Sequence, residues 1–200
     1  MSAAGKIAPG EAGGQMLSFA SAARWEAWLA KNHARSKGLW LRIFKKNSGI
    51  KTISYAEALD GALCHGWIDG LRKTHDDSSY IQKFTPRRPK SVWSKINTQH
   101  IERLIQAKRI KGAGLAVVEE AKRDGRWQAA YDSPKRSAMP ADFLRSLAKD
   151  RKAKAFFETL NKVNLYAIAW RLQTARNPET RARRMQAILE MLANEKKFHS

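Results

Sequence analysis

Two arginines stand between two prolines in the segment Thr85-Pro86-Arg87-Arg88-Pro89-Lys90-Ser91. Prolines fix the backbone φ angle and so restrict the directions in which Arg87 and Arg88 point. A planar guanidinium group offers paired N–H donors that fit a phosphate or a carboxylate. A helix beginning at Ser91 adds backbone N–H groups with partial positive charge. This segment is therefore the strongest candidate for an anion-binding site.

Further polar and basic residues join this candidate site. Ser94 and Asn97 follow Ser91 at intervals of three residues, which places them on one side of the predicted helix. Lys45 and Lys46 end a predicted strand, and an antiparallel sheet brings them to the side of the arginine segment. The alternative is that Ser91 only caps the helix while Ser94 and Asn97 are ordinary polar surface.

The arginines also have a structural alternative. Ion pairs with Asp69 or Asp76 would fasten a predicted β-hairpin to the helix without any ligand. A third possibility is an enzyme acting on a small anionic substrate, with Trp67, Asp69 and Trp93 as pocket candidates around Arg87. Asp69 would then act as a general base if a pocket forms beside it.

Cys64 and His65 are the residues that most resemble a nucleophile and its base. A reactive thiol needs a cationic neighbour or a helix N-terminus, whereas Cys64 is predicted at a helix C-terminus. We therefore expect Cys64 to be a buried residue that packs in the core. The densest metal-ligand types are His65, His75, Asp76 and Asp77, but their spacing fits no common site. We expect no metal and no cofactor.

The bulk composition is strongly basic. Lys and Arg number 38 against 18 acidic residues, which gives a net charge of +20. Such a charge attracts nucleic acid or phosphorylated small molecules, although solvated surface cations give the same count. The hydrophobic fraction of 43% with seven Trp and seven Phe predicts a folded core.

The location follows from cysteine usage and hydropathy. A single cysteine cannot form an intramolecular disulfide and is typical of a reducing compartment. The first residues lack the apolar stretch of a signal peptide, and no stretch is apolar for long enough to span a membrane. We expect a cytoplasmic protein without a membrane span.

The pattern of capping residues and apolar spacing predicts an α+β fold, with a small antiparallel sheet and packed helices followed by a C-terminal helical portion. Ser54 and Glu57 form a capping box at the start of one helix. The predicted strands are 39–46, 67–74 and 79–85. The predicted C-terminal helices are 113–124, 140–149, 151–160, 164–176 and 178–195. On the last of them, Arg181, Arg183 and Arg184 either extend the basic surface or form a solvated face.

The predicted organisation has three parts. Residues 1–18 form a flexible leader, residues 19–124 an α+β unit, and residues 125–200 a helical portion that shares the same core. Structure is expected to begin at Phe19.

Several sequence motifs resemble the YdeI/OmpD-associated family, also called bacteriocin-protection proteins. The central ones are ALCHGWIDG at 62–70 and FTPRRPKSVWSKIN at 84–97. Supporting stretches are WLAKNH (28–33), LWLRIFKK (39–46), SYAEALDGAL (54–63), AKRDGRW (121–127) and ETRARRM (179–185). The resemblance spans roughly residues 19–190 and implies links to envelope stress and bacteriocin protection. Our leading hypothesis is a non-enzymatic anion-binding or stress/bacteriocin-protection protein of that family. The alternatives are a nucleic-acid-binding protein and an enzyme acting on a small anionic substrate.

Overall fold

The computed structural model describes residues 15–134 and 136–199, and it divides the chain into two units. Unit 1 comprises Met1–Ser91 and Gln99–Asp124, and unit 2 comprises Val92–Thr98 and Gly125–Ser200. The predicted α+β class is confirmed: a four-stranded sheet lies in unit 1, and helices dominate the rest of the described chain.

The sheet has the strand order β1-β2-β4-β3. Its strands are β1 (Met16–Ser18), β2 (Leu39–Phe44), β3 (Trp67–Asp76) and β4 (Ser79–Pro86). β2, β4 and β3 are antiparallel, as predicted, whereas β1 joins β2 in parallel. The sequence pattern misses β1 because three residues carry no periodic signal. Structure thus begins before Phe19, and residues 1–14 of the expected leader lie outside the described residues.

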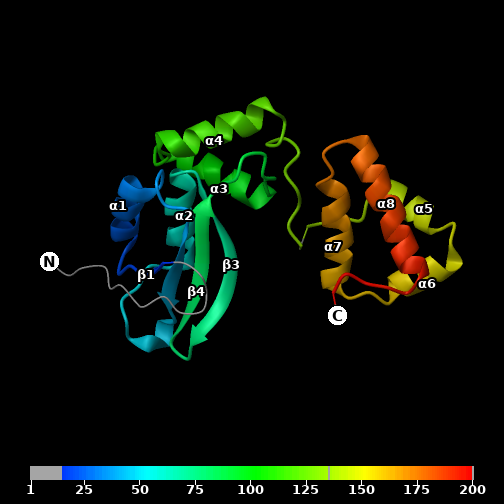
Figure 1. Cartoon of the computed structure of the whole chain (residues 1–200), viewed down its shortest axis with the longest axis horizontal. Coiled ribbons are helices and arrows are strands. Elements are labelled where there is room, and N and C mark those ends of the chain that lie inside the picture. The colour runs from blue at the N-terminus through cyan, green and yellow to red at the C-terminus, as the bar shows by residue number, and fades with distance from the viewer. Residues whose placement is uncertain (1–14, 135, 200) are drawn as a thin grey trace. The chain divides into compact units, whose positions relative to one another are not determined.

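Two helices cover one face of this sheet (Figure 1). They are α1 (Ala22–Asn32) and α2 (Tyr55–Cys64). Alternate residues of a strand face opposite sides, so Leu39, Leu41 and Ile43 meet the helices while Trp40 and Arg42 face the other way. Trp25 fills the interface and donates a hydrogen bond of 3.0 Å to the carbonyl of Ala58.

Local sequence signals set the start of both helices. Ser21 accepts a hydrogen bond from the N–H of Arg24 at the start of α1. The predicted capping box of α2 is present: Ser54 accepts from the Glu57 N–H, and the Glu57 carboxylate accepts from the Ser54 N–H. α2 ends at Cys64, and Gly66 follows with a φ of +74°, a conformation that suits glycine.

Helices α3 (Lys95–Gln106) and α4 (Gly112–Arg123) complete unit 1, although α3 begins in unit 2. α4 contacts α2 closely because Gly114 has no side chain to separate them. The Lys111 N–H donates to the carbonyl of Cys64 over 3.0 Å. The end of α2 is therefore held by the start of α4.

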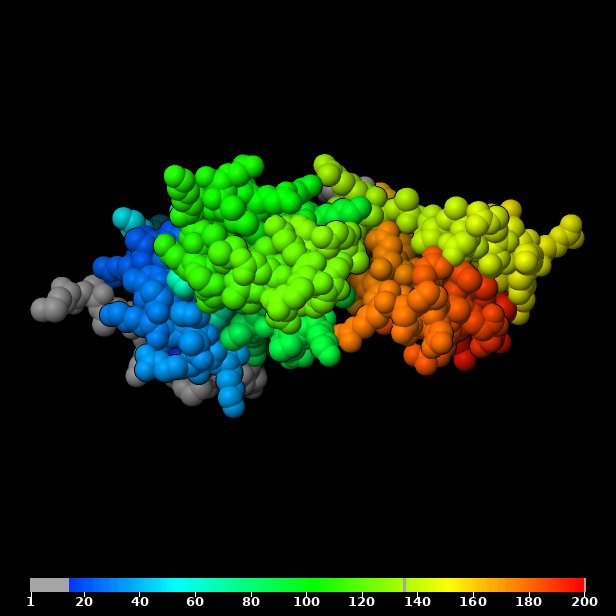
Figure 2. Space-filling model, turned by 90° about the horizontal axis from the view of Figure 1, so that it is seen from above, coloured from blue at the N-terminus to red at the C-terminus, as the bar shows by residue number. Residues whose placement is uncertain are grey.

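Unit 2 is a bundle of helices with its own buried cluster. The helices are α5 (Ala141–Leu147), α6 (Arg151–Glu158), α7 (Lys162–Gln173) and α8 (Pro178–Ala193). Figure 2 shows α7 and α8 in orange to red beside α5 and α6 in yellow. Each of the four helices contributes side chains to this buried cluster, among them Phe143, Ala153, Ile168 and Ile188. Predicted and observed bounds of these helices differ by three residues or fewer.

Candidate functional site

The predicted basic residues of unit 1 lie at two different ends of the sheet. The Lys45 N–H donates to the carbonyl of Ser78 over 2.8 Å, at the hairpin end of β4. The Arg87 N–H donates to the carbonyl of Gly66 over 3.0 Å, at the other end. An eight-residue strand spans about 25 Å. The expectation that Lys45 joins the arginines is therefore wrong, because antiparallel pairing of β2 carries it the opposite way.

Lys45 and Lys46 line a small pocket at the hairpin end, with a volume of about 420 Å³. Its other lining residues are Asn47, Ser48, Asp77 and Ser78. Both lysines are exposed, and Asp77 brings a carboxylate into the same pocket. Lys45 and Lys46 thus share a pocket, but the Asp77 carboxylate offsets part of their positive charge.

The helix after the arginine segment begins at Lys95, so the predicted start at Ser91 is wrong. Ser94 is the cap: its hydroxyl accepts from the Asn97 N–H over 3.2 Å. Ser94 itself forms a β-bridge with Tyr131: the Tyr131 N–H donates to the carbonyl of Trp93 over 2.9 Å, and the Lys95 N–H donates to the carbonyl of Tyr131 over 2.9 Å. Both serines are good caps by type, and the pairing with Tyr131 selects Ser94.

This later start changes the predicted site. The first N–H groups of α3 lie beyond Ser94, and one of them already binds the Ser94 hydroxyl. Ser94 and Asn97 are thus brought together as a cap. Arg88 is exposed and Arg87 is half-buried, both within unit 1. Their role in binding an anion stays a prediction.

Trp67, Asp69 and Trp93, the three residues expected to line a pocket around Arg87, have other partners. Trp67 is 1% exposed, and its indole N–H donates to the His33 carbonyl over 3.1 Å. Trp93 is also buried, with its ring 5.1 Å from that of Trp127. The structure thus places both indoles in packed interiors.

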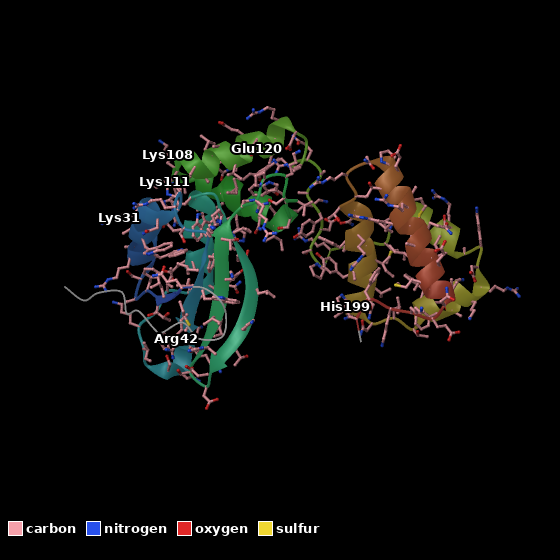
Figure 3. The ribbon with its side chains drawn as sticks, in the orientation of Figure 1. Lys31, Arg42, Lys108, Lys111, Glu120 and His199 are labelled. Carbon is pink, nitrogen blue, oxygen red and sulfur yellow. The ribbon has the colours of Figure 1, made fainter. Side chains whose placement is uncertain are left out.

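The partner of Asp69 is the side chain of Tyr55. The Asp69 carboxylate accepts a hydrogen bond of 2.8 Å from the Tyr55 hydroxyl. Burial, and then this hydrogen bond, raise the pKa of Tyr55 above its ordinary value. Asp76, the other expected partner of the arginines, forms an ion pair of 2.6 Å with Arg42 near the hairpin end. Arg42 is labelled in Figure 3.

Cys64 packs in the interior, as predicted. It is 2% exposed at the last position of α2. Burial raises the pKa of its thiol to about 11, so the thiolate is disfavoured at neutral pH. Within the described part of the chain, no three His, Cys, Asp or Glu side chains gather in a way that suits a metal ion. Every described helix is too short or too polar to cross a bilayer.

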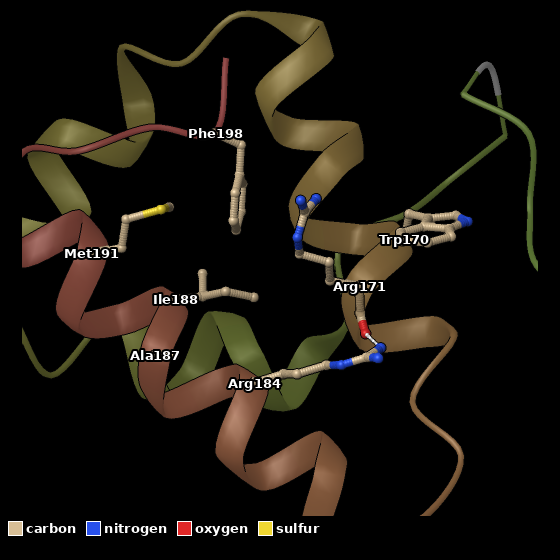
Figure 4. A pocket seen from close by; sticks show the side chains of 7 residues that line it. All are labelled: Trp170, Arg171, Arg184, Ala187, Ile188, Met191 and Phe198. Carbon is tan, nitrogen blue, oxygen red and sulfur yellow. Dashed lines mark hydrogen bonds between the residues drawn. The ribbon is translucent and has the colours of Figure 1, made fainter. Parts of the chain in front are cut away.

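A pocket in unit 2 brings together two arginines that the sequence does not single out as a pair. Its volume is about 320 Å³, and it lies between α7, α8 and the segment after α8. The lining residues are Trp170, Arg171, Arg184, Ala187, Ile188, Met191 and Phe198. Figure 4 shows Arg184 reaching from α8 to α7, and the Arg171 guanidinium pointing toward Phe198.

Both guanidinium groups are held by backbone carbonyls. Arg184 donates through Nη1 to the carbonyl of Arg171 over 2.8 Å, and Arg171 donates through Nη1 to the carbonyl of Ala167 over 3.1 Å. Burial, and then the charge of Arg184, lower the pKa of Arg171 below its ordinary value. Two like charges are therefore fixed near each other in a partly desolvated place.

Among the described residues, no carboxylate forms an ion pair with Arg171 or Arg184. By contrast, Arg181 on α8 binds Asp142 through both of its terminal nitrogens, one of them over 2.9 Å. None of the lining residues of the pocket is acidic. A guanidinium carries five N–H donors, so Arg171 and Arg184 keep donors for an added anion. This pocket is the best candidate site in the described chain.

Sequence reasoning overlooked this site for a physical reason. Arg171 and Arg184 lie on different helices, and only the packing of α7 against α8 joins them. One signal was present: Arg171 sits among residues that are buried, such as Ala167, Ile168 and Leu172. A charged residue on an apolar helix face needs a partner or a function.

Two models of protein families match the chain. Residues 17–117 match a domain of unknown function (DUF8412). Residues 137–195 match the family described as Bacteriocin-protection, YdeI or OmpD-Associated. No curated protein matches the chain, and neither does any solved structure. Arg171 and Arg184 lie within the second match, and Arg87 lies within the first.

Proposed function

The chain belongs to a family with a domain of unknown function at residues 17–117, its residues 137–195 belong to the Bacteriocin-protection, YdeI or OmpD-Associated family, and from this premise we propose that it is a small-anion-binding protein. The proposed binding site is the pocket between α7 and α8. Arg171 and Arg184 supply the charge. The protein acts by binding and not by catalysis, because the groups that line the site are donors and apolar side chains.

One observation carries this proposal: two guanidinium groups share a pocket whose lining holds no carboxylate. A desolvated charge without a counterion is unfavourable. An anion between the two groups offsets that cost and forms charge-assisted hydrogen bonds with both. The volume lies at the low end of the range of small-molecule sites, about 300–1,000 Å³. A metabolite-sized anion therefore fits better than a polymer.

A thermal-shift screen tests the proposal. The wild type is heated with phosphate, short carboxylates, nucleotides and short oligonucleotides, beside the Arg171→Met/Arg184→Met double variant. At a free concentration c, an anion that binds the folded state stabilises it by RT ln(1 + c/Kd), so the melting temperature rises with the anion concentration. We expect at least one small anion to stabilise the wild type and not the double variant.

The chain offers a matched control on the same helix. Arg183→Met removes the same charge one residue away, from an exposed position outside the pocket lining. Its response to the anion should equal that of the wild type. If Arg183→Met and Arg184→Met weaken the stabilisation equally, general surface charge explains the effect and the pocket does not.

The arginine segment of unit 1 enters the same screen. An Arg87→Ala/Arg88→Ala variant that loses the stabilisation while the unit 2 variant keeps it would move the site to Arg87 and Arg88. Oligonucleotide binding that falls steeply with salt would favour nucleic acid, because phosphate contacts release counterions. The net charge of +20 is the observation behind that second candidate.

The family description adds a cellular expectation. If protection against bacteriocins depends on the bound anion, cells that express the wild type should survive bacteriocin better than cells that express Arg171→Met/Arg184→Met. Equal survival at equal protein levels would separate protection from this pocket.

A further inference from the structure

We infer that the ligand of this pocket is an amphipathic anion: one carboxylate attached to an apolar body about the size of a short acyl chain or a single ring. The inference rests on the proposed function and names the chemical class of its ligand. It follows from how charge and apolar surface are distributed around the cavity (Figure 4).

Three of the five apolar residues of the lining form the wall on the side of α8 and the segment after it. Ile188 and Met191 project from α8, one turn apart, and Phe198 approaches from the segment after that helix. Ile188 is 2% exposed, which anchors this side of the cavity in the core of unit 2. Inorganic phosphate would leave the exposed parts of Met191 and Phe198 in contact with water. An acyl chain or a ring would bury them and gain from their removal from water.

The charged part comes from the two arginines, and Arg171 adjoins the apolar wall at Phe198. Arg171 comes from α7, and Arg184 reaches α7 from α8. Nη1 of each arginine binds a backbone carbonyl, which leaves Nε and Nη2 as donors. A planar carboxylate matches the geometry of such a pair of donors. Charged donors next to apolar surface select a molecule that combines a carboxylate with an apolar body.

The segment after α8 is fixed so that Phe198 covers the Arg171 guanidinium. The Phe198 ring centre lies 3.7 Å from Cζ of Arg171. His199, labelled in Figure 3, donates its backbone N–H to the Asn164 side chain over 3.0 Å, and its carbonyl accepts from the same side chain over 3.2 Å. These bonds hold the backbone next to Phe198 independently of the ring. The ring can therefore be truncated without releasing the segment.

Isothermal titration calorimetry with a matched series tests the inference. The probes are hexanoate and 3-phenylpropanoate, acetate and inorganic phosphate as anions without an apolar body, and hexan-1-ol as the apolar body without charge. We expect hexanoate or 3-phenylpropanoate to bind the wild type at least about tenfold more tightly than acetate, phosphate or hexan-1-ol. The advantage over hexan-1-ol should shrink in Arg184→Met, vanish in Arg171→Met/Arg184→Met and persist in Arg183→Met.

The outcomes separate the two proposals. If acetate and phosphate bind as tightly as hexanoate and lose affinity in Arg184→Met, the amphipathic ligand is wrong while the anion site stands. If hexan-1-ol binds as tightly as hexanoate, or if Arg171→Met/Arg184→Met leaves hexanoate binding unchanged, both are wrong. If neither hexanoate nor 3-phenylpropanoate binds, the amphipathic ligand is wrong.

Phe198→Ala gives a second measurement that does not remove charge. It should weaken hexanoate binding more than phosphate binding, because the ring contacts the apolar body as well as the Arg171 guanidinium. Circular dichroism and the melting temperature report whether unit 2 stays folded. An unchanged hexanoate affinity in a folded Phe198→Ala variant would remove the apolar wall from the inference.

Discussion

Gly114 of α4 packs directly against the carbonyl oxygen of Cys64 at the end of α2. A Cβ atom at position 114 would overlap that oxygen and the neighbouring backbone. The contact lets Lys111 satisfy the same carbonyl, which would otherwise be one of the unpaired groups at a helix end. One glycine thus allows two helices to approach each other at their backbones.

Gly114→Ala should therefore destabilise the protein by about 2 kcal/mol, the usual cost of forcing extra atoms into a packed contact. Gly112 is the control, since a Cβ there meets nothing within 4 Å. Gly112→Ala should be neutral or slightly stabilising, because alanine restricts the unfolded chain. Urea unfolding monitored by tryptophan fluorescence measures both. Equal losses would mean that the close approach of α4 is not what Gly114 provides.

Cys64 should react slowly with a disulfide reagent in the native state. The folded pKa of about 11 exceeds the ordinary value of 9.0, and a difference of two units lowers the thiolate fraction about 100-fold at pH 8. Reaction in denaturant should thus be at least about 100-fold faster. Since Cys64 is the only cysteine, absorbance reports it directly.

The same shift predicts a dependence of stability on alkaline pH. The folded pKa of Cys64 lies above the unfolded value, so its contribution is fully present below about pH 9 and is lost as the pH rises toward 11. Cys64→Ala removes this contribution. The stability gap between wild type and Cys64→Ala should narrow across that window, and a gap that widens there would contradict the assigned burial.

Asp76 should make the hairpin sensitive to acid. Hydrogen bonds from Ser79 and then Ser78, together with Arg42, hold its pKa well below the ordinary value of 3.8. A depressed folded pKa adds stability that is present above the unfolded pKa and is lost as the pH falls below it. The difference in urea midpoint between wild type and Asp76→Asn should be largest at neutral pH. It should shrink below pH 3.8; a constant difference would argue against ionisation.

Ser94 should cap α3. Replacing a capping serine by alanine costs about 1 kcal/mol, because the Asn97 N–H loses its partner. Ser94→Asp keeps an acceptor at this position and should restore most of the loss. If Ser94→Asp unfolds as easily as Ser94→Ala, the contribution of position 94 is not capping.

Most helices and strands were predictable because their signals are local. Ser54 with Glu57 marks the start of α2, and Pro178 marks the start of α8. β1 and the start of α3 were not predictable in this way. β1 depends on β2, and the choice of Ser94 over Ser91 depends on Tyr131, which lies far along the chain.

The candidate site was less predictable than the fold. The sequence pattern predicts arginines at an anion site, but it places that site at Arg87 and Arg88 and not at Arg171 and Arg184. Arg87 and Arg88 attract notice because they are adjacent and flanked by prolines. Arg171 and Arg184 meet only through the packing of α7 on α8, and no spacing in one helix encodes that contact.

The early segment of unit 2 limits how this protein can be divided or recombined. Residues 92–98 belong to unit 2 although residues 99–124 return to unit 1. The ring of Trp93 lies 5.1 Å from that of Trp127, and Lys95 forms an ion pair of 2.8 Å with Asp132. A cut of the chain at residue 124 would therefore separate residues 92–98 from these partners, and the C-terminal fragment would hold an incomplete unit 2.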